Sequence, residues 1–404
     1  MPGMGATLDP SLPPSFVLLQ VTPRLEGGGV EQVTLDMARA AARVGAGSLV
    51  ASWGGTLERD LARTGARLER MAVHARDPIS IALNAGRLAR LIRREKASLI
   101  HVRSRAPAFS ALWAARATGI PMVATYHGVY ASGSALKRRY NRIMTRGEAV
   151  IANSQFTLRH LLQEHGTPAG RLCVIPEGID LAKFDPAAVS VDRVFAARRA
   201  MGLDPSDARP VILLAARLTG WKGQAVALAA LGRLVADRLS GDAPVLVMAG
   251  REERAGEAKR LTDLAASAGV RDAVRLPGSL ADMPAALKSA DLVIAPSTSP
   301  ESFGRSVAEA CAMGRPVIAS DLGALSETLR DGETGWLVPA GDTEALAGAM
   351  GRALRMTRDA REVVGARARA RIAADFSLER MVEASFALYR QLIDERRGEL
   401  EAAP

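Results

Sequence analysis

Two glutamates, Glu301 and Glu309, stand eight positions apart in the stretch "ESFGRSVAEACAMGRP" at residues 301–316. Paired carboxylates often act as acid and base, but eight helical positions rise about 12 Å. The two carboxyl groups of a glycoside-hydrolysing enzyme lie only about 5–9.5 Å apart. The spacing therefore favours contacts with two parts of one long ligand over acid–base chemistry at a single bond.

The residues between the two glutamates predict a helix that begins near Gly304. The first amides of a helix have no partner within it and favour a negative charge. We expect this turn to bind a diphosphate through the amides of Gly304, Arg305, Ser306 and Val307, with Glu301 at the head of a nucleotide conjugate and Glu309 at its ribose. The alternative is an N-terminal helix charge and a solvated glutamate, although Glu309 stands among apolar residues and there needs a partner.

Two further loops carry residue types suited to anions. Arg217 and Lys222 lie in "RLTGWKGQ", where an arginine fork and a lysine point charge would suit a diphosphate, unless both are merely solvated. The triplet Gly27–Gly29 in "EGGGVE" would allow close approach of a ligand to the backbone, unless it is a plain turn. Neither loop matches the dinucleotide fingerprint or the phosphate-binding P-loop.

Short apolar runs with helical patterns between them predict parallel sheets covered by helices on both faces. We expect strands at 16–21, 48–53, 99–104, 122–128, 149–154, 172–178, 211–218, 244–250, 274–278, 292–297, 316–320 and 335–339. They form two series, which predicts an α/β protein with two doubly wound domains at 16–188 and 189–375, a disordered segment at 1–15, and a crossing helix and tail at 376–404. The loops above follow strands, and ligands bind beyond the carboxyl ends of such sheets.

Composition narrows the partners and the compartment. The 404 residues carry a net charge of +10, which favours an anionic partner, while only 4% aromatic residues argue against stacking on single-stranded nucleic acid. Cys173 and Cys311 provide neither a disulfide framework nor a metal-ligand set, so we expect a reducing cytoplasm. We recognise no signal peptide at the N-terminus and no apolar window of about 18 residues that would span a bilayer.

Taken in order, "EGGGVE", "TYHG", "VIPEGID", "RLTGWKG" and the 301–316 stretch resemble retaining glycosyltransferases of family four. That family has the GT-B fold of two facing Rossmann-like domains, and the resemblance covers about residues 16–395. Two residues depart from the family pattern: Glu177 stands where members commonly have Asn, and Ala216 where they have Gly. We expect neither departure to alter the charged residues of the site.

The resemblance implies a role for each matching position. Arg217 and Lys222 neutralise the donor diphosphate and stabilise the leaving group. Glu301 contacts the transferred sugar and Glu309 the ribose. The remaining donor contacts come mainly from backbone, at Gly28, Gly29, Leu276, Gly278, Phe303 and Gly304. His127, in "TYHG", faces the sugar from the first domain, although a lone histidine at a strand end is more often structural.

The resemblance also implies the chemistry. The sugar is transferred with retention of anomeric configuration, by front-face attack of an acceptor hydroxyl with the departing phosphate as base, after the domains close over the donor. No Asp-x-Asp motif follows a strand, so we expect no metal and no cofactor. By resemblance alone, the donor is GDP-mannose or a UDP-hexose.

The acceptor side is less distinct in the sequence. Four basic residues, Lys137, Arg138, Arg139 and Arg142, alternate with apolar Leu136, Tyr140, Ile143 and Met144. At helical spacing this predicts a basic amphipathic surface for an anionic membrane leaflet, as does 87–96, unless both are solvated helix faces. We then expect a glycolipid or lipopolysaccharide-core-type acceptor, contacted by Arg24 and Arg105, and an enzyme on the cytoplasmic face of the inner membrane.

Three other functions stay open. A nucleotide-sugar epimerase shares the GT-B fold without transferring sugar to an acceptor. A retaining phosphorylase would release a sugar phosphate. A basic protein that binds nucleic acid without catalysis is suggested only by charge, and we expect no nucleic-acid partner. The oligomeric state is not indicated.

Overall fold

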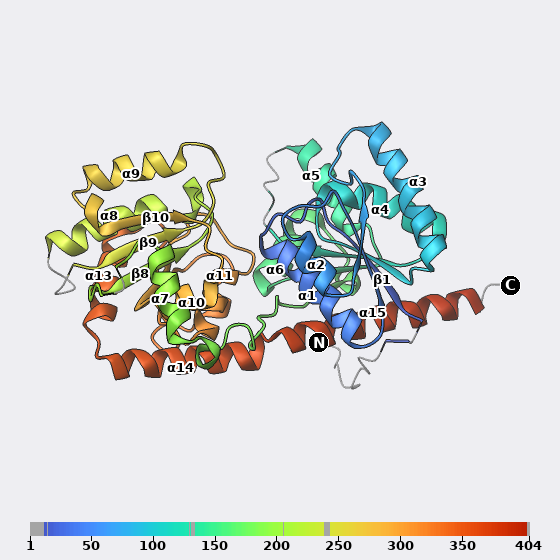
Figure 1. Cartoon of the computed structure of the whole chain (residues 1–404). Helices are drawn as coiled ribbons and strands as arrows, with labels where there is room; N and C mark the ends of the chain where they lie inside the picture. The colour runs from blue at the N-terminus through green and yellow to red at the C-terminus, as the bar shows by residue number, and fades with distance from the viewer. Residues whose placement is uncertain are drawn as a thin grey trace. The chain divides into compact units, whose positions relative to one another are not determined.

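The computed structural model describes residues 12–13, 15–128, 130, 134–204, 206–237 and 243–401. The chain divides into two compact units (Figure 1). Unit 1 takes in the chain up to Gly178 and again from Leu378, and unit 2 is Ile179–Ser377. Among the described residues, no helix is long and apolar enough to cross a membrane.

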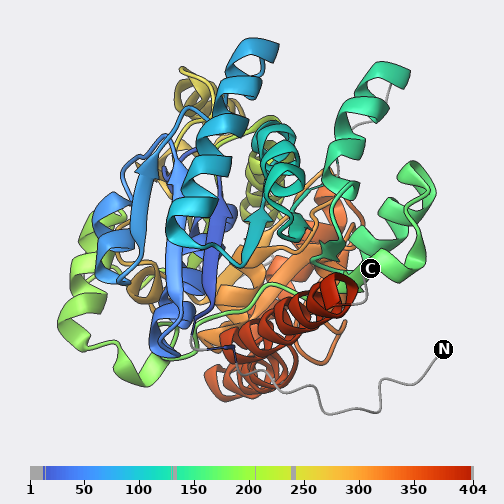
Figure 2. The same cartoon turned by 90° about the vertical axis from the view of Figure 1, so that its right-hand side faces the viewer.

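Unit 1 contains a parallel sheet of seven strands in the order β3-β2-β1-β4-β5-β6-β7. The strands are β1 Val17–Val21, β2 Gly47–Ser52, β3 Arg67–Arg70, β4 Leu99–Val102, β5 Met122–Tyr126, β6 Ala149–Ala152 and β7 Leu172–Val174. The helices are α1 Gly29–Arg43, α2 Glu58–Arg63, α3 Pro78–Glu95, α4 Arg105–Thr118, α5 Ala135–Asn141, α6 Gln155–His165 and α15 Leu378–Glu401. Helix α15 lies along the sheet of this unit (Figure 2), where its Phe386 and Tyr389 share a core with Phe16 and Leu18.

Unit 2 contains a parallel sheet of six strands in the order β10-β9-β8-β11-β12-β13. The strands are β8 Val211–Ala215, β9 Val245–Ala249, β10 Val274–Gly278, β11 Leu292–Ala295, β12 Val317–Ser320 and β13 Trp336–Val338. The helices are α7 Val191–Ala200, α8 Gln224–Ala236, α9 Glu257–Ser267, α10 Met283–Lys288, α11 Arg305–Ala312, α12 Leu325–Thr328, α13 Thr343–Arg355 and α14 Arg358–Asp375. Alternate residues of β8 enter two different apolar cores, so both faces of the sheet are covered.

The predicted doubly wound α/β architecture is confirmed, with one strand missed. Strand β3 has the sequence "RLER" and forms the outer edge of the first sheet. Its first and last residues, Arg67 and Arg70, are exposed, so it lacks the apolar run by which the other strands are recognised. Edge strands often carry charges in this way because charge opposes pairing with another chain.

The chain passes between the units at residues 178/179 and 377/378, whereas the sequence predicts these boundaries at 188/189 and 375/376. Phe184 and Val189 lie before the expected first boundary but pack in a core of unit 2. The expected crossing helix corresponds to α15, which packs on unit 1. Most of the segment expected to be disordered, 1–15, lies outside the described residues.

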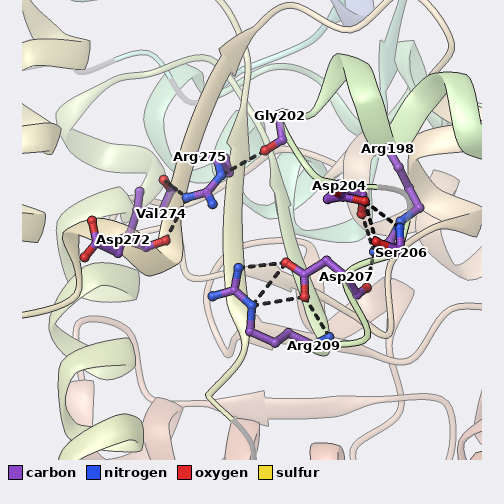
Figure 3. Close-up of polar contacts among 9 residues, drawn as sticks. All are labelled: Arg198, Gly202, Asp204, Ser206, Asp207, Arg209, Asp272, Val274 and Arg275. Atoms are coloured by element: carbon purple, nitrogen blue, oxygen red, sulfur yellow. Dashed lines mark hydrogen bonds and ion pairs between the residues drawn. The ribbon is translucent and has the colours of Figure 1, made fainter.

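A polar cluster fixes the amino ends of β8 and β10 in unit 2 (Figure 3). The guanidinium of Arg209 lies 2.7 Å from the Asp207 carboxylate, and lowers the pKa of Asp207 to about 2. Arg275 donates from Nε to the carbonyl of Gly202 at 2.9 Å. Arg275 is next to Leu276, a predicted donor contact, but its own side chain joins β10 to the segment after α7.

Candidate active site

The ammonium of Lys222 meets the carboxylate of Glu301 in unit 2. Strands β8 and β11 are neighbours, so the residues that follow their carboxyl ends come together. Lys222 ends the 3-10 turn Gly220–Lys222 after β8, and Glu301 follows β11. Lys222 Nζ lies 2.7 Å from Glu301 Oε2, with 14% and 9% of the two side chains exposed. Ser297 Oγ donates to Glu301 Oε1 at 2.5 Å, so both carboxylate oxygens are engaged.

Two glycines bring the backbone close enough to form this pair. Gly223, directly after Lys222, has φ +77°, and a Cβ there would overlap the carbonyl oxygen of Pro296. Gly323, after β12, has φ +70°, and a Cβ there would overlap the backbone of Glu301. Ala324 N–H donates to the Glu301 carbonyl at 2.9 Å. The loops after β8, β11 and β12 therefore pack backbone against backbone around Lys222 and Glu301.

Helix α11 begins beside Glu301. Gly304 is its N-cap at φ +85°, and no side chain caps the first turn. The Val307 N–H donates to the Gly304 carbonyl at 3.0 Å, so this amide already has a partner in the helix, and its contact with a diphosphate stays a prediction. The side chain of Phe303 is buried against Phe376, with ring centroids 5.8 Å apart, which leaves only its backbone for a ligand. Arg305 and Ser306 are partly exposed in the same turn.

Glu309 pairs within its own helix. Arg305 Nε lies 3.0 Å from Glu309 Oε1, and both side chains are mostly buried. Arg305 thus provides the partner that the Glu309 carboxylate needs in its apolar surroundings. The two glutamates of the 301–316 stretch therefore engage different cations, Lys222 for Glu301 and Arg305 for Glu309.

The other donor-side predictions are more dispersed. Arg217 is exposed, and its Nη1 lies 2.8 Å from Glu253 Oε1, so it shares a loop with Lys222 but not a carboxylate. Gly278 ends β10 at φ +77°, and its carbonyl accepts the Gly250 N–H at 2.8 Å. Leu276 is partly buried against the core between the sheet and α8.

His127 follows β5 in unit 1 and contacts the carboxylate of Glu177. His127 Nδ1 lies 3.0 Å from Glu177 Oε1, with 3% and 8% of the side chains exposed. Asn153 Nδ2 donates to the same oxygen at 3.0 Å. Glu177 therefore contacts a predicted site residue, His127, although the pairs of Lys222, Glu301 and Arg217 do not involve it. The segment "VIPEGID" indicated only a turn, and no local pattern indicated that Glu177 would contact His127.

A buried polar layer continues from this pair. Arg103 is buried, and its Nη2 lies 3.4 Å from His101 Nδ1. The ring of His101 also contacts the hydroxyls of Tyr389, at 2.6 Å, and Thr125, at 2.7 Å. Burial holds the pKa of His101 well below its ordinary value, so this ring is neutral. His101 is a core histidine within β4.

The glycine loop of unit 1 lies where it was predicted, between β1 and α1. Gly28 is the N-cap of α1 and Gly29 its first residue, with no side chain capping the turn. Gly27 has φ +95°, a conformation that favours glycine. Arg24, in the same loop, is exposed and pairs with Glu26 at 2.9 Å.

The basic residues predicted for the acceptor side are exposed, but the helix differs from expectation. Helix α5 ends at Asn141 and a 3-10 turn, Arg142–Thr145, follows. Ile143 and Met144 are buried in a core of unit 1, so our prediction of an amphipathic helix with these residues on an outer apolar face is wrong. The four predicted basic residues are exposed: Lys137, Arg138, Arg139 and Arg142. Leu136 is 78% exposed beside them.

Arg105 is held in place at the start of α4. Its Nη1 donates to Asn141 Oδ1 at 2.8 Å, and its guanidinium carbon lies 3.8 Å from the centroid of the Tyr130 ring. Tyr140 packs nearby against Phe109. These contacts orient a partly exposed cation, which suits a binding role better than the freely solvated Lys137 does.

Two family models match the chain. Residues 27–183 match the family described as "Glycosyltransferase Family 4", and residues 202–371 match "Glycosyl transferases group 1". Together the two matches span most of the chain. The chain belongs to glycosyltransferase family 4. The resemblance of the sequence motifs to that family is thereby confirmed.

Individual proteins support the assignment. The chain is 35% identical over 262 residues to the D-inositol 3-phosphate glycosyltransferases of Mycobacterium tuberculosis and Mycobacterium bovis. The alignment covers 64% of this chain and 52% of those proteins, so the chain spans about half the length of the curated relatives it matches.

Solved structures confirm the fold. A glycosyltransferase from Rickettsia africae superposes with a TM-score of 0.84 at 29% identity, covering 94% of this chain and 98% of that one. HepE of Anabaena, solved with UDP and glucose, gives 0.77 at 22% identity, covering 96% and 100%. WaaG, a glycosyltransferase involved in lipopolysaccharide biosynthesis, gives 0.72 at 16% identity, covering 92% and 99%. The two doubly wound units are those of the GT-B fold.

Proposed function

We propose that this protein is a retaining, metal-independent glycosyltransferase that moves a hexose from a nucleotide sugar to an acceptor hydroxyl. The observation that carries the proposal is the mostly buried Lys222–Glu301 pair beyond the carboxyl ends of β8 and β11. A GDP-mannose or UDP-hexose donor presents a diphosphate for the cation and sugar hydroxyls for the carboxylate. HepE, with the same fold, was solved with UDP and glucose, which agrees with such a donor.

Lys222 and Glu301 play complementary parts in this proposal. The ammonium neutralises charge that develops on the leaving diphosphate, and a cation in a mostly buried place does so more effectively than one in water. The carboxylate accepts hydrogen bonds from the sugar while its charge holds the ammonium. Arg217 adds a second cation after leaving Glu253, and Glu309 accepts from the ribose.

The surroundings of Glu301 also bear on the stereochemical route. Its oxygens are engaged by Lys222 and Ser297, which lowers the nucleophilicity of the carboxylate. We therefore favour front-face attack over a covalent glycosyl-enzyme. The acceptor oxygen bonds to the anomeric carbon on the face from which the diphosphate departs, and its proton passes to a phosphate oxygen.

We place the acceptor at an anionic membrane surface, as a glycolipid or lipopolysaccharide-core-type hydroxyl on the cytoplasmic face of the inner membrane. Two helices of unit 1 support this. Helix α5 exposes Leu136 beside Lys137, Arg138 and Arg139. Helix α3 exposes Ile79 and Leu83, followed at helical spacing by exposed Arg87 and Arg90. Apolar groups next to cations suit a leaflet of anionic lipids. Arg105 and Arg24 would contact the acceptor itself.

Product analysis tests the proposal. The purified chain is incubated with GDP-mannose or UDP-hexoses and with lipopolysaccharide core, glycolipid or inositol phosphate as acceptor, with and without EDTA. We expect acceptor-dependent release of the nucleoside diphosphate, an anomeric coupling in the proton NMR spectrum that matches the donor, and no effect of EDTA. An altered sugar still attached to the nucleotide would identify an epimerase. A sugar phosphate formed from inorganic phosphate would identify a phosphorylase.

A further inference from the structure

Glu177 is a buried glutamate in unit 1, at a position to which the sequence assigns no part in the site. Its Oε1 accepts a hydrogen bond from Asn153 Nδ2 at 3.0 Å and lies 3.0 Å from His127 Nδ1. Asn153 follows β6, His127 follows β5, and Glu177 follows β7, so three adjacent strand ends converge on one carboxylate oxygen. These residues line or adjoin a small cavity of about 20 Å³, which Arg103, His101 and Thr125 also line.

We propose that Glu177 is a positioning residue that fixes the tautomer and ring orientation of His127. An ionised carboxylate only accepts hydrogen bonds, so a contact at 3.0 Å requires the proton of the neutral ring to be on Nδ1. The lone pair is then on Nε2, which makes that nitrogen an acceptor for a substrate hydroxyl. An Asn at position 177 has a shorter side chain and could present either an amide or a carbonyl.

The surroundings keep the carboxylate in place. Asn153 is fully buried, and its Oδ1 accepts from Thr157 Oγ1 at 2.9 Å, which orients its Nδ2 toward Glu177. Burial lowers the pKa of the Arg103 guanidinium, and the charges of Tyr389 and Glu177 act in the opposite direction. The alternative is that Glu177 acts only as a countercharge for Arg103, and a test must separate that structural role from an effect on His127.

Two substitutions separate the two roles. E177Q removes the charge but retains an oxygen that can accept from His127 and Asn153. E177M removes both the charge and the acceptor at similar side-chain length. If Glu177 acts on His127, E177Q should resemble the wild type and E177M should not. If it acts only as a countercharge for Arg103, both variants should be impaired alike. E148Q is the matched control, because Glu148 accepts the Met122 N–H at 2.7 Å in the same unit without contacting His127.

The first readout is the tautomer itself, which requires no substrate. The full chain is labelled with nitrogen-15 at its five histidines, and His127 is assigned by its loss in H127N. We expect ring nitrogen shifts at pH 8 that place the proton on Nδ1 in the wild type, E177Q and E148Q, and a tautomer mixture in E177M. A proton on Nε2 in the wild type would overturn the proposal, even if E177M failed to fold.

The second readout rests on the proposed function. We expect kcat/KM with the nucleotide sugar to fall about tenfold in E177M and H127N, the size of one lost hydrogen bond. The double variant should lose no more than H127N alone, because Glu177 acts through the ring. If the double variant lost kcat/KM by the product of the two single losses, the proposal would be contradicted. Affinity for the free nucleoside diphosphate should be unchanged in E177M. Absence of that binding in the wild type would count against the proposed function but not against the tautomer result.

Discussion

Lys222 Nζ and Glu301 Oε2 lie 2.7 Å apart, each mostly buried, at the ends of adjacent strands in unit 2. Ion pairs inside proteins are costly to desolvate and are weak as a source of stability. The presence of this ion pair beyond the carboxyl ends of β8 and β11, where ligands bind to such sheets, therefore favours a functional role. The pair also means that the donor diphosphate must share the ammonium with Glu301, which sets opposite expectations for the two residues.

Substitution of Glu301 should separate turnover from nucleotide binding. In E301Q the sugar loses a charged acceptor, so we expect kcat to fall about 100-fold. The ammonium of Lys222 no longer has a competing carboxylate, so affinity for the nucleoside diphosphate should stay constant or rise. Initial rates and isothermal titration on the same preparation test this. Parallel loss of turnover and affinity would contradict the sugar-contacting role of Glu301.

The Lys222–Glu301 pair should also be visible in stability. K222M leaves the Glu301 charge mostly buried without its cation, and we expect the free energy of unfolding to fall by about 3 kcal/mol. The double variant K222M/E301Q should lose less than the sum of the single losses, because neither charge remains. Denaturant unfolding of unit 2 measures this. Arg358 provides the control, since its pair with Glu362 is exposed and R358A should leave stability unchanged. Additive losses would show that the two charges are not coupled.

Membrane association should depend on the basic face of α5. We expect the triple reversal K137E/R138E/R139E to weaken sedimentation with phosphatidylglycerol vesicles at least tenfold, because each cation near an anionic leaflet contributes to binding. The reversal R352E/R355E/R358E changes the net charge equally at exposed positions of unit 2 and should have little effect. Equal weakening by both sets would indicate attraction through net charge alone.

Both cysteines should be unreactive in the folded protein. Burial raises the pKa of the Cys173 and Cys311 thiols to about 12. The thiolate is the reactive form, and it is scarce at every pH well below that value. We therefore expect no alkylation by iodoacetamide at pH 8, and two labels after unfolding in guanidinium, as read by mass spectrometry. Rapid labelling of the native chain at pH 8 would contradict this assignment.

The sequence predicted the architecture because twelve of the strands are apolar runs, and it missed β3 because "RLER" is not. It placed Lys222, Glu301 and Arg217 at strand ends of one sheet for the same reason. It could not predict which charges would pair, because the approach of Lys222 to Glu301 depends on backbone contacts made by Gly223 and Gly323.

The contact between Glu177 and His127 could not be predicted from the sequence. Glu177 contacts His127 only because β5 and β7 flank β6 in the sheet, and strand order is not written in any local pattern. The burial of Ile143 was likewise hidden, because the change from α5 to a 3-10 turn redirects the residues that follow Asn141. In both cases the decisive contact is long-range or depends on the exact end of a helix.

The most direct test of the account is calorimetric titration of GDP, UDP and ADP into the wild type and into K222M. We predict that one of the three binds the wild type and that K222M binds it at least tenfold more weakly, because the diphosphate loses its buried cation. Equal affinity in the two proteins, or no binding of any of the three to the wild type, would contradict the assignment of the donor site to Lys222 and Glu301.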